Sequence, residues 1–192
     1  NSSAFRMDPE VPLVVPEVNA SDALKHKGII ANPNCSTIQA VVALKPIYDN
    51  YGIKRIVYST YQAVSGSGSQ GIADLERGVK GEPATFYPKP IAFNCLPHID
   101  VFTENGYTKE ELKMVNETRK IFSDQSLRIT ATTVRVPVMY GHSESINVET
   151  EKQFELSDIF AMYEQDPSIV LMDNVSENIY PTPLIAEDTD PV

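Results

Sequence analysis

The segment Asn32-Pro33-Asn34-Cys35-Ser36-Thr37 carries the residue best suited to covalent chemistry. A turn signal precedes Cys35, and apolar residues recur at helical spacing after it. We therefore expect Cys35 at the start of a helix, where backbone N–H groups and the helix dipole lower the pKa of a thiol. A small buried cysteine is the alternative that the position leaves open. Cys95, in a proline-rich segment, has no comparable setting and is more typical of a structural cysteine.

Three histidines could exchange a proton with such a thiol. His26 lies between two lysines, and His98 lies in a segment typical of a surface or an interface. His142 follows a long strand pattern, at a point where a side chain can project into a cleft. Arg135, seven residues earlier, could bind a carboxylate with two hydrogen bonds while His142 serves the reacting carbon. His142 is therefore the preferred acid/base candidate.

Two weaker features have competing explanations. The stretch Ser65-Gly66-Ser67-Gly68 could approach a phosphate or pyrophosphate at the start of the following helix. It lacks GxGxxG spacing and a Walker lysine, so a plain connector explains it equally well. Glu110 and Lys113 are three residues apart on a predicted helix and share one face. They could belong to a site or form an exposed ion pair.

The elements that must position these residues alternate between helical and strand patterns. Helical patterns cover residues 36–51, 71–80, 108–122 and 156–164, and strand patterns cover 28–31, 54–64, 128–138, 145–150 and 169–172. Pro46 is expected to kink or split the first helix. Residues 180–192 show neither period. The order predicts an α+β fold with a mixed, largely antiparallel sheet and helices packed on one face.

Composition narrows the function classes. The 192 residues contain 16 Lys+Arg and 26 Asp+Glu, a net charge of −10, which argues against nucleic acid or an anionic membrane surface as a partner. With only two cysteines and no apolar run near ~20 residues, we expect a cytoplasmic protein without a membrane span. We expect no metal site.

The motifs occur together in a known order. Residues 32–37, 61–66, 135–138 and 141–143 resemble the aspartate-β-semialdehyde dehydrogenase family of the bacterial type, over nearly the whole chain. Glyceraldehyde-phosphate dehydrogenases carry Ser-x-x-Cys-Thr-Thr, and N-acetyl-glutamyl-phosphate reductases usually carry Pro-Gly-Cys. The resemblance implies a glyceraldehyde-3-phosphate dehydrogenase-like C-terminal domain. It also implies NADP-dependent, reversible conversion of L-aspartyl 4-phosphate to L-aspartate 4-semialdehyde and phosphate, in lysine, threonine, methionine and diaminopimelate biosynthesis.

The resemblance also implies roles for particular residues. Catalysis would involve Cys35 as the thioester-forming nucleophile, His142 as general acid/base and Gln62 as the residue that orients the acyl group. The substrate would be bound by Arg135 at the α-carboxylate, Glu110 at the α-amino group, and Arg6, Asn34 and Lys113 at the phosphate. The cofactor would be approached by Ser65, Gly66, Ser67 and Gly68.

The domain organisation follows from the same resemblance. Residues 1–27 would lead in from a cofactor domain, and residues 28–192 would form the catalytic and dimerisation domain. We expect the Rossmann NADP domain and the C-terminal return segment to be absent, and the chain alone to be inactive. Partners would be the small substrate, phosphate and further copies of the chain, as a dimer or tetramer. Two alternatives are an N-acetyl-glutamyl-phosphate reductase-like enzyme and a non-catalytic oligomerisation module that uses residues 83–97.

Overall fold

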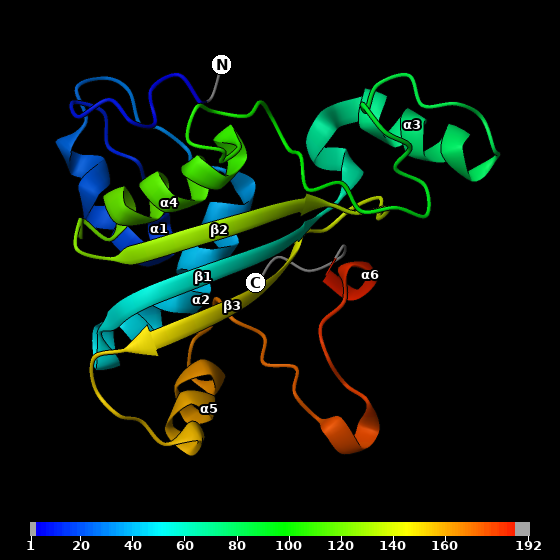
Figure 1. Cartoon of the computed structure of the whole chain (residues 1–192). Coiled ribbons are helices and arrows are strands. Elements are labelled where there is room, and N and C mark those ends of the chain that lie inside the picture. The colour runs from blue at the N-terminus through cyan, green and yellow to red at the C-terminus, as the bar shows by residue number, and fades with distance from the viewer. Residues whose placement is uncertain (1–2, 187–192) are drawn as a thin grey trace.

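A mixed three-stranded sheet forms the centre of the computed structural model, which describes residues 3–186. The order is β2 (Arg128–Arg135), β1 (Ile53–Gln62), β3 (Ser143–Thr150), as Figure 1 shows. β1 pairs parallel with β2 and antiparallel with β3. The α+β class and the mixed sheet are confirmed. Pairing is evenly divided rather than largely antiparallel, because a long helical crossover returns β2 parallel to β1.

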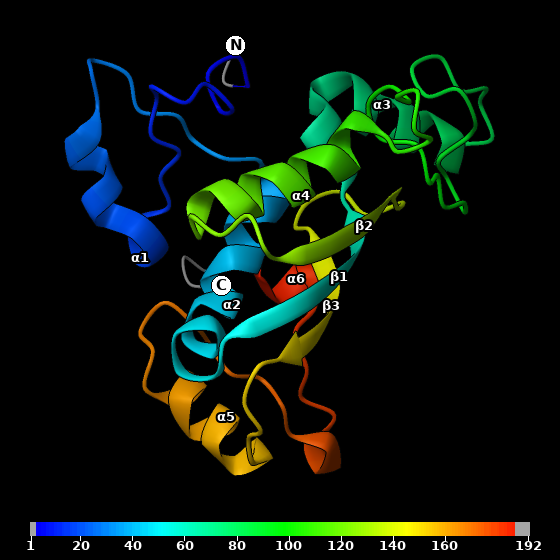
Figure 2. The ribbon, with the colours of Figure 1, turned by 60° about the vertical axis from the view of Figure 1, so that its left-hand side comes forward.

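Two long helices cover the same face of this sheet. Figure 2 shows α2 (Cys35–Tyr51) and α4 (Lys109–Ile121) side by side on it. The side chains of β1 alternate, so that Ile56 and Tyr58 are fully buried against Leu44 and Met114. Burial of these apolar groups holds the helices on the sheet, and the predicted one-sided packing is confirmed.

The opposite face of the sheet is the more exposed one. Figure 1 looks onto it, with α2 behind the strands. Val57, Ser59 and Tyr61 alternate with the buried residues of β1, and Tyr61 is 47% exposed. Their partners on β3, Asn147 and Ser145, are also exposed. This surface is called the open sheet face below.

The start of α2 is fixed by its N-cap. The Asn34 side-chain oxygen accepts hydrogen bonds from the backbone N–H groups of Ser36 (3.1 Å) and Thr37 (3.4 Å). The helix continues through Pro46 without being split and ends before Gly52, whose φ of +66° suits glycine. The cap therefore places Cys35 at the first helical position.

The start of α4 is fixed by a capping box between Thr108 and Glu111. The Thr108 N–H donates to the Glu111 carboxylate at 2.7 Å, and the Glu111 N–H donates to the Thr108 hydroxyl at 3.3 Å. Glu110, Lys113 and Glu117 then follow at spacings of three and four, so they lie on one face of the helix. That face points toward the start of α2.

A separate small lobe flanks the carboxyl end of β1. It comprises a short 3-10 helix (Val64–Ser67), α3 (Gly68–Val79) and the proline-rich segment 83–97, which folds back on α3. Buried Asp74 accepts backbone hydrogen bonds from Thr85 (2.8 Å) and Tyr87 (3.0 Å) and fixes that segment. Residues 83–97 therefore pack, at least in part, on their own chain.

The remaining elements lie at the edges. They are α1 (Pro16–Asn19), 3-10 helices at Ala20–Lys25 and Val175–Glu177, α5 (Leu156–Glu164) and α6 (Pro183–Ala186). The strands predicted at 28–31 and 169–172 are wrong. Ala31 makes only an isolated bridge to Leu13, because prolines interrupt the partner segment. The predicted irregular tail contains α6, and its last six residues lie outside the described part.

Within residues 3–186, no helix is both long and apolar enough to cross a bilayer.

Candidate active site

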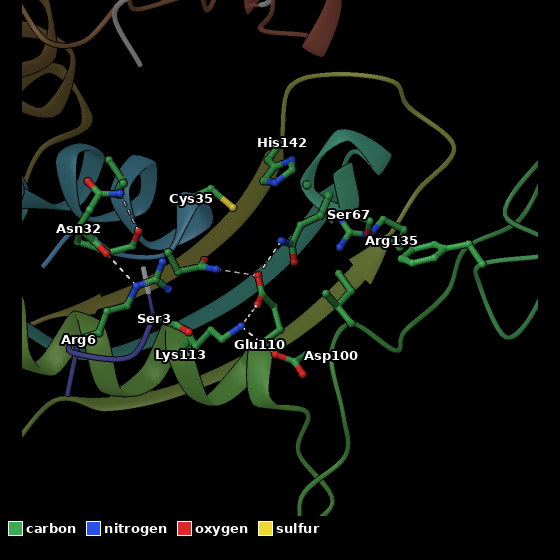
Figure 3. A pocket seen from close by; sticks show the side chains of 17 residues that line it. Ser3, Arg6, Asn32, Cys35, Ser67, Asp100, Glu110, Lys113, Arg135 and His142 are labelled. Atoms are coloured by element: carbon green, nitrogen blue, oxygen red, sulfur yellow. Dashed lines mark hydrogen bonds and ion pairs between the residues drawn. The ribbon is translucent and has the colours of Figure 1, made fainter. Parts of the chain in front are cut away.

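A cavity of about 540 Å³ lies where β1 and β2 end and α2 and α4 begin. Figure 3 shows the side chains that line it. The lining residues are Ser3, Arg6, Asn32, Pro33, Asn34, Cys35, Ile38, Gln62, Gly66, Ser67, Phe86, Ile99, Asp100, Glu110, Lys113, Arg135 and His142. The fold thus brings together the three predicted catalytic and five predicted substrate-binding residues, with Gly66 and Ser67 of the loop. Ser65 and Gly68 are not among the lining residues.

The thiol of Cys35 points into this cavity but is not acidic. Although the residue as a whole is exposed, desolvation of the sulfur by the cavity walls, and then the charge of Glu110, raise the pKa of the thiol above its ordinary value. Hydrogen bonds from the Ser36 and Cys35 N–H groups, and the charge of Arg135, offset part of the rise. The expectation of a lowered pKa is wrong, because the cavity wall and a carboxylate outweigh the helix terminus. The position at the helix start is as expected.

His142 is neutral in these surroundings. Burial, and then the charge of Arg135, lower its pKa to about 4. Its Nδ1 accepts a hydrogen bond from the Ala63 N–H at 3.1 Å. The neutral ring therefore carries its proton on Nε2 and is a hydrogen-bond donor there. Nε2 could act as a base only after the ring turned away from Ala63.

Glu110 connects several of the cavity side chains. One of its carboxylate oxygens accepts hydrogen bonds from the side-chain amides of Asn34 (2.9 Å) and Gln62 (3.0 Å). The other oxygen accepts from Lys113 Nζ at 2.9 Å. Burial would raise the pKa of Glu110, but the hydrogen bonds from Gln62 and Lys113 outweigh it and lower the pKa. Since Glu110 is only 5% exposed, an exposed ion pair with Lys113 is excluded.

Lys113 has a second acidic partner, Asp100, at 2.9 Å. Burial lowers the pKa of Lys113, but these two carboxylates more than compensate, so the ammonium is retained. Asp100 adopts a φ of +66°, a conformation that aspartate tolerates better than most residues. Its place beside the cavity depends on the tertiary fold of the loop, so no local sequence pattern reveals it.

Arg6 enters the cavity from the N-terminal segment. Its Nε donates to the Asn32 carbonyl at 2.8 Å, and its Nη1 donates to the Glu117 carboxylate at 3.1 Å. Nη2 is therefore the nitrogen with no partner among the described residues. Neither Glu117 nor Asp100 is assigned a role by the sequence motifs. The spacing of Glu117 from Glu110 and Lys113 does place it on the same face of α4, and could have indicated that it lies near the site.

In the view of Figure 3, Arg135 lies to the right of Cys35, Arg6 to its lower left and Lys113 below it. Its Nη1 donates to the Ala63 carbonyl at 2.6 Å, and within residues 3–186 its buried Nε has no hydrogen-bond partner. A Cβ on Gly66 would lie 3.1 Å from Arg135 Nη1 and 3.2 Å from His142 Nε2. The close approach of the loop backbone explains why glycine stands at this position.

The family of the chain follows from comparison with known proteins. Residues 44–192 match the family model described as "Semialdehyde dehydrogenase, dimerisation domain". The chain belongs to this family.

Relatives and solved structures of the semialdehyde dehydrogenase family agree with the match. The aspartate-semialdehyde dehydrogenase of Aquifex aeolicus is 57% identical over 201 residues, which cover all of this chain and 59% of that protein. A Vibrio cholerae structure, aspartate semialdehyde dehydrogenase II complexed with ASA, is 49% identical. It has a TM-score of 0.89 and covers 95% of this chain and 56% of that one. The chain thus spans about three fifths of the length of these relatives.

A more distant structure binds a dinucleotide. The aspartate semialdehyde dehydrogenase of Candida albicans, solved with NADP, is 26% identical with a TM-score of 0.63. The match covers 85% of this chain and 47% of that one. The predicted family and the glyceraldehyde-3-phosphate dehydrogenase-like fold are confirmed.

The raised thiol pKa leads to a pH prediction. In a Cys95→Ser background, the rate of Cys35 alkylation by iodoacetamide will rise steadily with pH through the neutral range, because the thiol is protonated and His142 is neutral. A thiolate–imidazolium pair would instead give a flat, fast rate between about pH 5 and 8. Such a plateau would contradict the electrostatic description of this cavity.

Proposed function

We propose that this chain forms the catalytic and dimerisation part of an aspartate-semialdehyde dehydrogenase. The enzyme reduces L-aspartyl 4-phosphate to L-aspartate 4-semialdehyde and releases phosphate, and the reaction is reversible. The observation that carries the proposal is that Cys35 lines one cavity with three cations, Arg6, Lys113 and Arg135. A substrate with a phosphate near its reacting carbon and a carboxylate at its far end matches this arrangement.

The first step is acyl transfer to Cys35. The thiol gives its proton to His142 once that ring has turned away from Ala63, the sulfur attacks the acyl carbon to form a C–S bond, and the C–O bond to the phosphate breaks. Arg6, Lys113 and Asn34 stabilise the departing phosphate. Gln62, already oriented by Glu110 at 3.0 Å, holds the acyl group above the thiol.

His142 serves the acyl oxygen. Its Nε2–H donates as negative charge develops there, which lowers the energy of the tetrahedral states. As general acid/base it also exchanges a proton at this nitrogen, and uptake of a proton requires the ring to leave Ala63 N–H. Arg135 binds the substrate α-carboxylate and Glu110 its α-ammonium, so both ends of the substrate are fixed.

NADP fits this chain only in part. The loop backbone at Gly66 lies against His142 and Arg135, so Gly66 and Ser67, with Ser65 and Gly68 beside them, fit the reactive end of a dinucleotide. No glycine-rich Rossmann fingerprint occurs in the sequence, and we assign the rest of NADP to another domain of the full-length enzyme. When bound, NADPH supplies the hydride that reduces the thioester. The chain alone is therefore expected to be inactive.

Glu110, the proposed partner of the substrate nitrogen, argues against the alternative that this chain is an N-acetyl-glutamyl-phosphate reductase. Glu110 retains its negative charge and suits an ammonium group, whereas an acetylated nitrogen carries no charge. Asn34 also stands where those reductases usually have glycine, and its amide donates to Glu110 at 2.9 Å. We place the enzyme in amino-acid biosynthesis, towards lysine, threonine, methionine and diaminopimelate, in the cytoplasm.

Oligomerisation is proposed to use the open sheet face. The matching family model describes a dimerisation domain, and this face presents exposed Tyr61 and partly buried Val57 beside small polar residues. A second copy of the chain would cover it. Dimers could further associate into tetramers.

The chemical proposal is tested in the full-length enzyme with aspartate semialdehyde, inorganic phosphate and NADP. Cys35→Ser should reduce kcat about a thousandfold or more, because no thioester can form. Cys95→Ser, which changes an exposed cysteine outside the cavity, should leave the rate unchanged. The proposal fails if Cys35→Ser stays active, or if N-acetylglutamate semialdehyde is the better substrate.

The interface is tested by Tyr61→Asp, which places a carboxylate on the open sheet face. Burying that charge is unfavourable, so sedimentation velocity should show the variant dissociating at concentrations where the wild type is associated. Leu24→Asp changes an 88% exposed leucine on the 3-10 helix Ala20–Lys25 and should keep the wild-type mass. Unchanged association of the Tyr61 variant, or a monomeric wild type, would exclude this interface.

A further inference from the structure

Glu117 is a buried carboxylate that belongs to none of the groups assigned above. It is 1% exposed and does not line the cavity. Its two oxygens have different partners. One accepts from Arg6 Nη1 at 3.1 Å, and the other accepts from the backbone N–H of Asn34 at 2.6 Å.

These two partners come from distant parts of the chain. Arg6 is 111 residues from Glu117 in sequence, and Asn34 is 83 residues away. The Arg6 guanidinium also donates to the Asn32 carbonyl at 2.8 Å. The N-terminal segment, the turn before Cys35 and helix α4 are therefore joined around one carboxylate.

The orientation of Arg6 depends on this arrangement. With Nε committed to Asn32 and Nη1 to Glu117, the plane of the guanidinium is fixed, and no residue between 3 and 186 occupies Nη2, which can face a ligand. The same carboxylate fixes the backbone of Asn34, whose side chain caps α2 just before Cys35. A substitution at Glu117 should therefore alter the position of the Arg6 guanidinium and of the turn that precedes Cys35.

We propose that Glu117 is a positioning residue for the phosphate subsite, a role that rests on the proposed function. It holds Arg6 at the distance from Cys35 that the leaving phosphate requires, without touching the substrate. Arg135, which binds the far end of the substrate, is held by the Ala63 carbonyl and within residues 3–186 shares no hydrogen bond with Glu117, so binding of the α-carboxylate should not depend on this role.

The test uses Glu117→Gln in the full-length enzyme, assayed in the direction that consumes semialdehyde and phosphate. The amide keeps the shape of the side chain but replaces one acceptor oxygen with an NH₂ group, so in the present geometry either Arg6 or Asn34 would face a donor instead of an acceptor. KM for inorganic phosphate should rise about tenfold, while KM for aspartate semialdehyde stays within about twofold. Glu104→Gln, an exposed carboxylate on the loop before α4, makes the same charge change and should alter neither constant.

A double-mutant cycle with Arg6→Lys separates positioning from a general structural effect. If Glu117 acts through Arg6, Glu117→Gln should add little to the phosphate KM of an Arg6→Lys enzyme. If Glu117→Gln does not fold, Glu117→Asp, which keeps the charge but shortens the reach, should raise the phosphate KM in the same direction.

Four outcomes would overturn this inference. They are an unchanged phosphate KM, a lowered one, an equal rise in both KM values, and full additivity with Arg6→Lys. A wild-type enzyme that does not consume semialdehyde and phosphate would instead overturn the proposed function itself, and the role of Glu117 with it.

Discussion

The carboxylate of Glu110 is the group on which the cavity depends. It is buried and ionised, and it remains so because three donors compensate for its desolvation. Those donors are the N-cap of the cysteine helix, the last residue of β1 and a lysine of α4. One carboxylate therefore holds side chains from the three elements that carry the candidate chemistry. Two turns further along the helix, Glu117 also joins distant segments through its two oxygens, but there burial outweighs the donors and raises the pKa of the carboxyl.

Protein acceptors that hold cations in place also explain how an acidic protein could bind an anionic substrate. The chain carries a net charge of −10, yet three of its cations meet at one cavity. Each is held by a protein acceptor, Glu117 for Arg6, Glu110 for Lys113 and the Ala63 carbonyl for Arg135. Because these acceptors use only some of the donors, the cations are oriented and can still bind a ligand.

Patterns of neighbouring residues predict the structural features that depend on short-range interactions. The capping box at Thr108, the start of α2 at Cys35 and the strand β1 each depend on residues close in sequence, and the structure has all three. The strands expected at 28–31 and 169–172 fail because a strand needs a partner, which a local pattern does not supply. Glu117 and Asp100 depend on contacts far apart in sequence, and so does the thiol pKa.

The most direct measurement is a crystal structure of the full-length Glu110→Ala enzyme. If Glu110 positions the cavity side chains, α2, α4 and β1 will superimpose on the unaltered protein. The side-chain amides of Asn34 and Gln62 will leave their present positions, and Lys113 will pair with Asp100 alone. If both amides and Lys113 keep their positions without the carboxylate, Glu110 does not organise the cavity, and the central claim is wrong.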